Sequence, residues 1–589
     1  MKFLSSPLLW FLLAVSLFFV GLGAVGLVGP DEPRYADVAR AMLRSGDYIT
    51  PRLFGSPWFE KTPLYYWLAA LFFRLGVNDL DARLPSALSA CGFIGVWFWF
   101  SRRLFGKRAA TLACILLAST LGWIGFAHAA VMDMLLATTL DVAIALLALW
   151  FWEKEDFQLY GFYALLGLAT LAKGPVAVGL AGLVALAYVV TYGEWKALGK
   201  VLISPALGVF AIIAFPWYLL CYLRNGYPFI QEFFLKHNWE RYISTALGHP
   251  QPIWFYIPIL MAGVFPLTPL LLLPLVQILT TRPRAILANR SQVFLLYWVA
   301  LPFIFFSFSQ NKLPSYLLPI LPPLTLWIAL LIEGGSWEQT PAAALTNRVQ
   351  DHLKRLSPAV VPKESSSPGE DAGPVIADHG TLQKWALWLI GLSALLLVTI
   401  PILASLLGDF LTMGLLHTLA QLRAGGIWSA IRKGPLPPAA IIFLAAPLGL
   451  SLYMLWKRNL LEAAFFVLVG VALSMLGIVQ YISPSINRVA STRTVAQRIQ
   501  VMGISGENLA TYQLPRNQSL GLSFYMDHAL PEWSAKESPA SLAYLIAKDD
   551  EHLPDAQSRV FFPPQHLRLW MLPPTEFEIH IEPPTGKNP

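Results

Sequence analysis

Charged and aromatic side chains gather in one segment near the N-terminus, residues 30–82, between two long apolar runs. Carboxylates can serve as general bases and basic side chains can hold an anion, so such a cluster could bind and convert a charged substrate. The alternative is a solvated loop with a few surface ion pairs. Tryptophan, tyrosine and proline crowd the charges more tightly than in a plain linker, which favours a site. The charged and polar residues of this segment include Asp31, Glu32, Arg34, Tyr35, Asp37, Glu60 and Lys61.

An amphipathic helix is expected at the start of this segment. Apolar or aromatic residues recur at helical spacing, at Tyr35, Val38, Ala39, Met42 and Leu43, which places them on one face of a helix. Charged residues occupy the other face. Such a helix should lie along the membrane interface rather than cross the bilayer.

The surrounding composition is that of a membrane protein. Of the 589 residues, 56% are hydrophobic and 13% are charged, whereas soluble domains carry roughly 25% charged residues. Domain-size limits exclude burying so much apolar surface in one water-soluble core. The composition also excludes a disordered chain, a collagen and a disulfide-rich secreted scaffold. We therefore expect an all-α, polytopic membrane protein. Basic cytoplasmic loops account for the net charge of +7, so no nucleic-acid partner is expected.

A membrane-spanning helix needs roughly 20 apolar residues, and the sequence offers 13 such runs. The first, from Pro7 to Gly29, carries no charge and lacks a cleavage site of small residues, so we expect an uncleaved span rather than a signal peptide. An odd number of spans puts the two termini on opposite sides of the membrane. The other runs centre on residues 84–100, 109–127, 134–152, 159–172, 175–191, 201–222, 257–280, 292–308, 315–333, 383–407, 437–456 and 460–481.

The orientation follows from the basic residues of the short loops. Arginine and lysine concentrate in the loops at 101–108, 193–200, 281–290 and 456–459, which share a side with the N-terminus. The intervening short loops are nearly free of positive charge. The N-terminus should therefore lie in the cytoplasm and the C-terminus outside.

Two parts of the chain depart from the pattern of spans. Residues 337–381 are rich in Ser, Pro, Gly and charge and have no apolar period, which predicts a flexible cytoplasmic loop. After residue 482 the composition becomes more polar, with the strand-like stretches NLATYQL and EFEIHIE. We expect a transmembrane domain at 1–482 and a small C-terminal α/β domain outside the membrane at 483–589.

The stretch DEPRYADVARAMLRSGDYITPRLFG, followed by WFEKTPLYYWL, resembles the first outer loop of the family 39 glycosyltransferases, which have the GT-C fold. That family includes the bacterial aminoarabinose transferases and the protein O-mannosyltransferases. One departure is Thr62, where the family usually has a second proline after the lysine. The resemblance continues in order along nearly the whole chain, at HAAVMDM (128–134), AKGP (172–175), RYISTALGHPQPIWFYIP (241–258), SQNKLPSYLLPILP (309–322) and, for the aminoarabinose-transferase-like branch, TYQLPRNQSLGLSFYM (511–526).

The resemblance implies transfer of a sugar from a polyprenyl-phosphate carrier to an acceptor. The leaving phosphate monoester needs no general acid, so cations that hold it would lower the barrier; Lys61, Arg34 and Lys312 are expected in this role. A carboxylate near the anomeric carbon could act as base or stabilise positive charge on the sugar. Asp31 is the first candidate for this catalytic carboxylate and Asp133 the second. The other residues expected at the donor or substrate are Glu32, Tyr35, Tyr65 and Tyr316.

Several polar residues have two interpretations. Asp141 lies mid-span, where a charge costs roughly 2.5–3.5 kcal/mol, and we favour a hydrogen bond between helices over a functional role. Lys173 could either snorkel to the interface or contact phosphate. His128 is expected to be structural. The resemblance also implies a divalent ion, zinc or manganese, near Glu60 and His249.

Together these expectations describe a glycosyltransferase on the periplasmic face of the bacterial inner membrane. The donor would be an undecaprenyl-phosphate-linked sugar, and the acceptor a lipid A-like lipid or another envelope molecule such as a glycan. The site should be a cavity between the 30–82 loop and the outer ends of the spans, closed by residues 310–316. The alternatives are an enzyme of the protein O-mannosyltransferase type, or a flippase or transporter for a lipid-linked sugar. Transporters commonly contain repeats with broken helices in matching positions, and the sequence shows no such halves.

Overall fold

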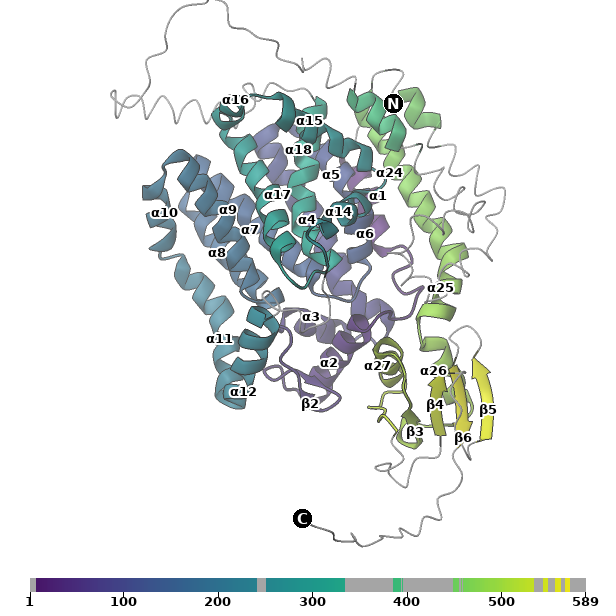
Figure 1. Ribbon diagram of the computed structural model, residues 1–589. Coiled ribbons are helices and arrows are strands. Elements are labelled where there is room, and N and C mark those ends of the chain that lie inside the picture. The colour runs from purple at the N-terminus through teal and green to yellow at the C-terminus, as the bar shows by residue number, and fades with distance from the viewer. Residues whose placement is uncertain are drawn as a thin grey trace, which may run out of the picture.

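The computed structural model describes residues 7–240, 251–333, 385–393, 449–454 and 459–533, three strands at 544–548, 557–562 and 567–571, and the single residues 395, 447 and 457. Figure 1 shows a bundle of long helices, with short helices and the C-terminal strands gathered at one end. Some sequence expectations lie outside the described residues: the loop 337–381, most of the runs 383–407 and 437–456, His249 and the strand EFEIHIE.

The long helices confirm a multi-pass membrane protein. Within the described residues, six helices are long and apolar enough to cross a membrane. A helix pair bent by 65°, α5 (Lys107–Ala118) and α6 (Leu121–Ala127), raises this to seven if it forms one span. The full count of 13 stays a prediction. The six are α4 (Asp79–Phe105), α7 (Asp133–Glu153), α11 (Leu207–Asn225), α17 (Arg290–Phe308), the 3-10 helix η5 (Pro314–Ile320) continued by α18 (Leu321–Glu333), and α24 (Leu460–Gly477) continued into the π-helix η7 (Ile478–Ile482).

The buried fraction of each of these helices indicates whether it lies at the centre of the bundle or at its rim. The most apolar stretch of α7 is 83% buried, whereas that of α11 is 17% buried. On α11, Ile212, Phe215 and Leu223 are 75%, 64% and 69% exposed. A water-soluble protein rarely exposes so large an apolar patch. We therefore place α11 at the lipid-facing rim, where hydrocarbon chains cover these side chains.

Besides the bent pair α5 and α6 in the run at 109–127, two further apolar runs that the sequence predicts as single spans are broken in the structure. The first run contains α1 (Pro7–Phe19) and then continues as turns. The run at 257–280 divides into α14 (Tyr256–Val264), the 3-10 helix η4 (Thr268–Leu271) and α15 (Leu272–Thr280). Pro266 and Pro269 fall at this division. Proline lacks an N–H group and clashes with the preceding turn, so a helix ends there although the stretch stays apolar.

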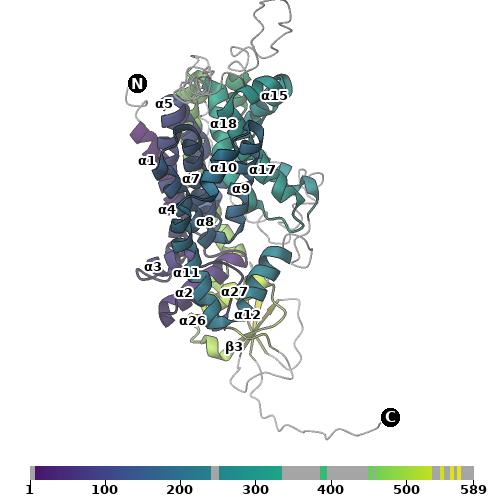
Figure 2. The same cartoon turned by 90° about the vertical axis from the view of Figure 1, so that its left-hand side faces the viewer.

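Shorter elements connect or flank the spans. In both views, α15 and α18 lie toward one end of the molecule, and α12, α27 (Arg516–Tyr525) and β3 (Leu509–Thr511) toward the other (Figures 1 and 2). The helix α8 packs between α7 and α11. The connecting helices are α8 (Asp156–Lys173), α9 (Val176–Tyr192), α10 (Trp195–Leu202), α12 (Tyr227–Ile230), the π-helix η2 (Gln231–Glu240), the 3-10 helix η3 (Ile253–Phe255) and α16 (Pro283–Ala288).

The charged segment after the first apolar run folds into α2 (Asp31–Ser45), the hairpin β1 (Arg52–Leu53) and β2 (Ser56–Pro57), and α3 (Leu64–Phe72). The two acidic residues of the first turn of α2 suit the positive end of the helix dipole. The helix ends at Gly46, whose φ of +68° favours glycine. This segment places the charges of the loop on a fixed scaffold at one end of the bundle.

Helix α2 is packed among neighbouring helices rather than exposed on the surface, and its predicted place along the membrane interface stays a prediction. It is covered by α3 on one side and by α27 on the other. Its charged residues are therefore buried: Glu32, Arg34, Asp37 and Arg40 are 4–6% exposed. This burial also excludes the alternative of a solvated loop with surface ion pairs.

The C-terminal part of the chain contains a four-stranded sheet with the order β3-β4-β6-β5. β3 and β4 pair in parallel, which requires a crossover connection. Val495, Ile499, Leu522 and Leu569 belong to a core separate from that of the bundle. The chain enters this part from η7 directly into α25, without a linker, so the domain boundary at 482 stays a prediction. Its elements are α25 (Ser483–Ala490), α26 (Arg493–Val501), the 3-10 helix η8 (Gly506–Asn508), β3, α27, β4 (Tyr544–Lys548), β5 (Gln557–Phe562) and β6 (Leu567–Met571).

Ion pairs attach this C-terminal part to the charged segment. Arg493 Nη1 lies 2.6 Å from Asp79 Oδ2, and the Tyr525 hydroxyl donates to Asp79 Oδ1 at 2.5 Å. Arg44 of α2 makes two hydrogen bonds to Asp527, of 2.7 and 2.6 Å. The C-terminal elements thus help to fix α2, which carries residues of the candidate site.

Candidate functional site

Four charged side chains form a continuous row where α2 meets the stretch between β2 and α3. Arg34 contacts the carboxylate of Asp31, and its Nη1 lies 2.8 Å from Glu60 Oε2. The Nζ of Lys61 lies 3.4 Å from Glu60 Oε1. Asp31 and Lys61 are therefore brought into one site through Arg34 and Glu60. We call these four residues the charged row.

The charged row is mostly shielded from water. The side chains of Arg34, Glu60 and Lys61 are 5%, 10% and 11% exposed, whereas that of Asp31 is 44% exposed. The guanidinium carbon of Arg34 lies 5.0 Å from the Tyr35 ring centroid and 5.2 Å from that of Trp58. Charges in such surroundings interact more strongly than in water. Asp31 is the member of the row that a substrate can reach most directly.

A second ion pair lies between the ends of two bundle helices. Lys173, the last residue of α8, pairs with Asp133, the first residue of α7. Ser315 also hydrogen-bonds to Asp133. The Lys173 ammonium sits 4.6 Å from the centroid of the Tyr316 ring. The pair is about nine-tenths buried, so Lys173 does not snorkel to solvent.

Glu60 and Lys61 of the charged row and Lys173 of the second pair line one cavity of about 540 Å³, whereas Asp31, Arg34 and Asp133 are not among its lining residues. The cavity lies between the π-helix η2, α9, α17 and η5. Its lining combines polar atoms with phenylalanine and aliphatic side chains. The polar lining residues are Glu60, Lys61, Lys173, His237, Ser309 and Tyr316, and the apolar ones include Leu136, Val176, Phe233, Phe234, Phe305 and Phe306.

This lining suits an amphipathic ligand with an anionic head. Two lysine ammonium groups at the polar side can hold a phosphate by charge-assisted hydrogen bonds. The phenylalanine side can hold a hydrocarbon chain. Cations fixed in a partly dry cavity stabilise a charge that develops on a leaving group without reorganising during the reaction.

Glu32 and Tyr65, which we expected at the substrate, serve the scaffold instead. The carboxylate of Glu32 accepts two bonds from Arg83, at 3.0 and 2.7 Å, and one each from the backbone N–H groups of Val28 and Ala130. The Tyr65 hydroxyl donates to the Ala82 carbonyl at 2.8 Å. Neither residue is among those that line the cavity. The structure thus gives no support to the predicted substrate contact of either residue.

Lys312 also lies apart from the cavity lining. Its ammonium donates to the backbone carbonyls of Ser309 and, at 2.9 Å, of Gln251. Burial lowers the pKa of Lys312. In the structure Lys312 fixes the connection between α17 and η5, and its expected contact with the donor phosphate stays a prediction. Tyr316, four residues later, does line the cavity.

Asp141 and His128, for which the sequence predicts structural roles, make hydrogen bonds that connect elements of the bundle. Asp141 is fully buried and accepts a hydrogen bond from the indole N–H of Trp298 at 3.0 Å, which joins α7 to α17. The ring nitrogens of His128 lie 2.9 and 3.1 Å from the carbonyl oxygens of Ile124 and Val20. Both side chains connect elements and stay away from the cavity.

Sequence reasoning missed His237, which lines the cavity from η2. The stretch QEFFLKHNWE gives no motif that marks it. The available signal is structural, because π-helices are rare and occur frequently at functional sites. The metal ligand implied by the resemblance, His249, lies outside the described residues.

The described residues contain no group of three or more His, Cys, Asp or Glu side chains that could hold a metal ion. At the cavity they provide one carboxylate, Glu60, and one imidazole, His237. Glu60 also contacts two cations of the charged row. This donor set fits an ion with open coordination positions rather than a closed structural site.

Comparison with known proteins finds two groups of similar glycosyltransferases. Residues 60–219 match the dolichyl-phosphate-mannose-protein mannosyltransferase family. The chain is 35% identical over 327 residues to the undecaprenyl phosphate-alpha-4-amino-4-deoxy-L-arabinose arabinosyl transferase of Pseudomonas aeruginosa, and 31% identical over 354 residues to that of Edwardsiella ictaluri. These matches cover 54% and 58% of this chain. They span 57% and 62% of the length of the two relatives.

The similarity in structure extends over almost the entire chain. The crystal structure of ArnT from Cupriavidus metallidurans bound to undecaprenyl phosphate superposes with a TM-score of 0.69 and 22% identity, covering 96% of this chain and 97% of that one. The apo structure gives a TM-score of 0.67. The chain has the GT-C fold. The resemblance predicted from the motifs is confirmed.

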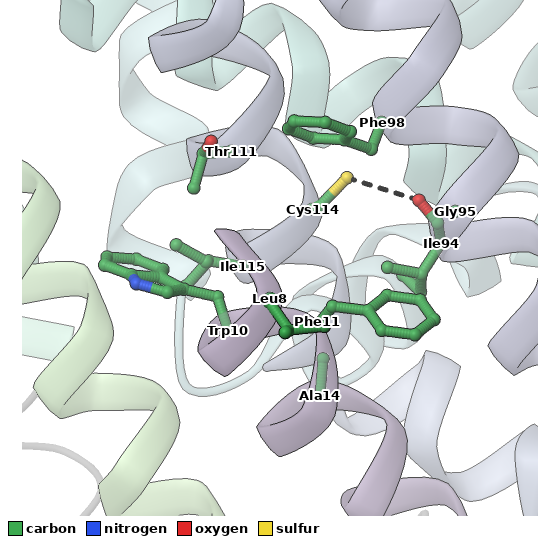
Figure 3. A pocket seen from close by; sticks show the side chains of 10 residues that line it. All are labelled: Leu8, Trp10, Phe11, Ala14, Ile94, Gly95, Phe98, Thr111, Cys114 and Ile115. Atoms are coloured by element: carbon green, nitrogen blue, oxygen red, sulfur yellow. Dashed lines mark hydrogen bonds between the residues drawn. The ribbon is translucent and has the colours of Figure 1, made fainter. Parts of the chain in front are cut away.

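The GT-C bundle contains a further cavity that carries no reactive group. Figure 3 shows this space of about 220 Å³ between α1, α4 and α5. The Thr111 hydroxyl donates to the Lys107 carbonyl and the Cys114 thiol to that of Ile94. The polar groups of the lining are thus already bonded. Its other lining residues are Leu8, Trp10, Phe11, Ala14, Gly95, Phe98 and Ile115, which suit only an apolar occupant.

Proposed function

We propose that this chain is a glycosyltransferase that uses an undecaprenyl-phosphate-linked sugar and modifies a lipid A-like acceptor. The observation that carries the proposal is the cavity itself, whose lining contains Lys61 and Lys173 together with several phenylalanine side chains. The named relatives are transferases of 4-amino-4-deoxy-L-arabinose from undecaprenyl phosphate. The same sugar is therefore the donor group that we propose here.

In the proposed reaction, the bond between the anomeric carbon and the phosphate oxygen breaks, and a bond from the acceptor oxygen to that carbon forms. The electron pair leaves with the phosphate, whose charge Lys61 and Lys173 stabilise. Asp31, the exposed member of the charged row, accepts the proton of the acceptor or faces the positive charge on the sugar. Asp133 positions Lys173 through their ion pair.

The experiment that tests the reaction is mass spectrometry of envelope lipids and glycoproteins from cells with and without the gene. We expect a lipid A species heavier by one aminopentose only when the gene is present. A glycan that appears on proteins instead would favour the alternative, an enzyme of the protein O-mannosyltransferase type. The family match of residues 60–219 is the reason to test this alternative.

We propose further that the protein lies in the bacterial inner membrane with the charged row on the periplasmic side. The basic short loops then face the cytoplasm, as the positive-inside rule requires. A donor with an undecaprenyl chain enters sideways from the bilayer, while its phosphate and sugar stay in the polar part of the cavity.

This orientation predicts the labelling of single cysteines in whole cells. In a variant without Cys91, Cys114 and Cys221, an impermeant thiol reagent should label Ala540→Cys and should not label Val360→Cys until the cells are opened. Labelling of Val360→Cys in intact cells, or lasting protection of Ala540→Cys, would overturn the topology.

We also propose a divalent ion, zinc or manganese, at the polar side of the cavity, with Glu60 as the carboxylate ligand. His237 lines the cavity beside it, and His249 is the ligand that the resemblance implies. Such an ion would add positive charge beside the donor phosphate. We expect Glu60→Gln and one of the variants His237→Ala or His249→Ala to lose the ion in elemental analysis of the purified protein. Equal metal content in all three variants and the wild type would contradict this site.

A further inference from the structure

Four buried polar atoms near the charged row have no hydrogen-bond partner among the described residues. They are Arg34 Nε, Trp58 Nε1, Thr62 Oγ1 and the Tyr66 hydroxyl. Arg34, Thr62 and Tyr66 are 4%, 0% and 0% exposed. An unsatisfied buried donor or acceptor costs about 1–3 kcal/mol, and native structures retain few of them. Three of the four come from one short stretch, residues 58–66, which points to a common cause.

Trp58 and Tyr66 lie near the guanidinium group of Arg34, and Thr62 falls between them in sequence. The Trp58 ring lies 5.2 Å from the guanidinium carbon, and the Tyr35 ring, at 5.0 Å, packs 6.0 Å from that of Tyr66. Burial raises the pKa of Tyr66, the charge of Glu60 raises it further, and Arg34 opposes the rise. The hydroxyl is thus neutral and lies within electrostatic reach of the row.

We propose that Trp58, Thr62 and Tyr66 form the subsite that binds the sugar of the donor. This inference rests on the proposed function. A sugar carries several hydroxyl or amine groups, each of which can donate and accept. The indole N–H of Trp58 and the Nε–H of Arg34 can only donate, to oxygen or nitrogen atoms of the sugar. The hydroxyls of Thr62 and Tyr66 can donate and can also accept. One sugar ring beside the lysine-bound phosphate would satisfy all four orphan atoms.

The subsite is closed in the structure, because none of the four atoms touches solvent. Trp58 is only half-buried and follows directly after β2. The sugar reaches the subsite when the Trp58 side chain moves off Arg34. The unsatisfied atoms then gain hydrogen-bond partners only in the donor complex. The enzyme would therefore bind the donor more tightly than the same lipid phosphate without its sugar.

Thr62 supplies a hydroxyl to the subsite from the stretch between β2 and α3. The hydroxyl of Thr62 is fully buried and has no partner in the described structure. Thr62 is therefore expected to tune which sugar the enzyme accepts.

The test compares two neighbouring buried tyrosines in the full-length protein. In Tyr66→Phe, kcat/KM for undecaprenyl-phosphate-linked aminoarabinose should fall by about 10- to 100-fold. Inhibition by undecaprenyl phosphate, which lacks the sugar, should not change, and the melting temperature should not fall, because the variant removes an unsatisfied buried hydroxyl. Tyr65→Phe is the matched control, because its hydroxyl already bonds to Ala82. That variant should melt at lower temperature and keep the kcat/KM of the wild type.

Either of two results with Tyr66→Phe would overturn the inference. One is a wild-type kcat/KM, which would mean that ordered water, not sugar, satisfies the hydroxyl. The other is an equal loss of affinity for undecaprenyl phosphate, which would place Tyr66 at the phosphate. If the wild-type protein itself transfers no sugar, the proposed function fails and the inference fails with it.

Discussion

Replacing Lys61 with alanine is expected to lower kcat/KM about 100- to 1,000-fold without unfolding the protein. Lys61 lines the cavity and is 9% exposed, so the phosphate charge that it faces is poorly screened by water. Losing one preorganised contact of this kind costs about 2.7–4 kcal/mol of transition-state stabilisation. Glu60 keeps its bond to Arg34 in the variant, so the scaffold should hold. Steady-state transfer rates and thermal unfolding measure the two effects separately.

Lys236→Ala is the matched control for this prediction. Its side chain is 47% exposed and pairs with Glu232 one turn away on η2, close in sequence to the cavity residue His237. Its loss should change turnover less than about twofold, because exposed pairs contribute little. A well-folded Lys61→Ala enzyme with turnover near that of Lys236→Ala would show that Lys61 does not hold the leaving phosphate.

Replacing Asp31 with asparagine should reduce turnover by at least about 100-fold, the lower end of the effect of a positioned base. Asparagine keeps the shape of the side chain but removes the negative charge. The side chain is 44% exposed and Arg34 retains its contact with Glu60, so melting should change little. Measured kcat and melting temperature of Asp31→Asn, beside those of the wild type, check both expectations.

A structural interpretation of Asp31 makes a different prediction. If Asp31 and Lys61 were a direct clamp, the charge-swapped variant Asp31→Lys with Lys61→Asp could regain activity. The structure pairs Asp31 with Arg34, and Lys61 with Glu60, so the swap would put like charges beside each other at both positions. We expect no recovery. Substantial turnover in the double variant would mean that the two residues form a clamp rather than a catalytic pair.

The sequence was sufficient to locate the site but not to sort neighbouring residues within it. Clustering of charge and aromatic residues identified the segment 30–82, and Asp31 and Lys61 meet there through Arg34 and Glu60. Glu32 differs from Asp31 by one position, which is a rotation of about 100° on a helix. That rotation directs its carboxylate to Arg83, a residue 51 positions away. No local pattern reveals such a distant partner.

Helix breaks, and the side chains that reach the cavity from helix ends or from η2, depend on backbone geometry. The count of apolar residues along the sequence does not reveal that geometry. The run at 257–280 stays apolar across the break at Pro266, so composition predicts one span where the structure has three shorter helices. His237 enters the cavity because η2 is wound as a π-helix, which shifts side chains relative to an α-helix. The Lys173–Asp133 pair joins the ends of two helices. The motif AKGP (172–175) contains Lys173 but does not reveal its partner, so the sequence left the role of Lys173 open.

The most direct test is sugar transfer by the purified full-length protein in detergent, with undecaprenyl-phosphate-linked aminoarabinose and lipid A as the added substrates. A glycosyltransferase needs no separate compartments, so we predict that aminoarabinose-modified lipid A and undecaprenyl phosphate form in equal amounts, and that Lys61→Ala abolishes nearly all of both. Binding of the donor without any new glycosidic bond would contradict the account and would favour a flippase or transporter.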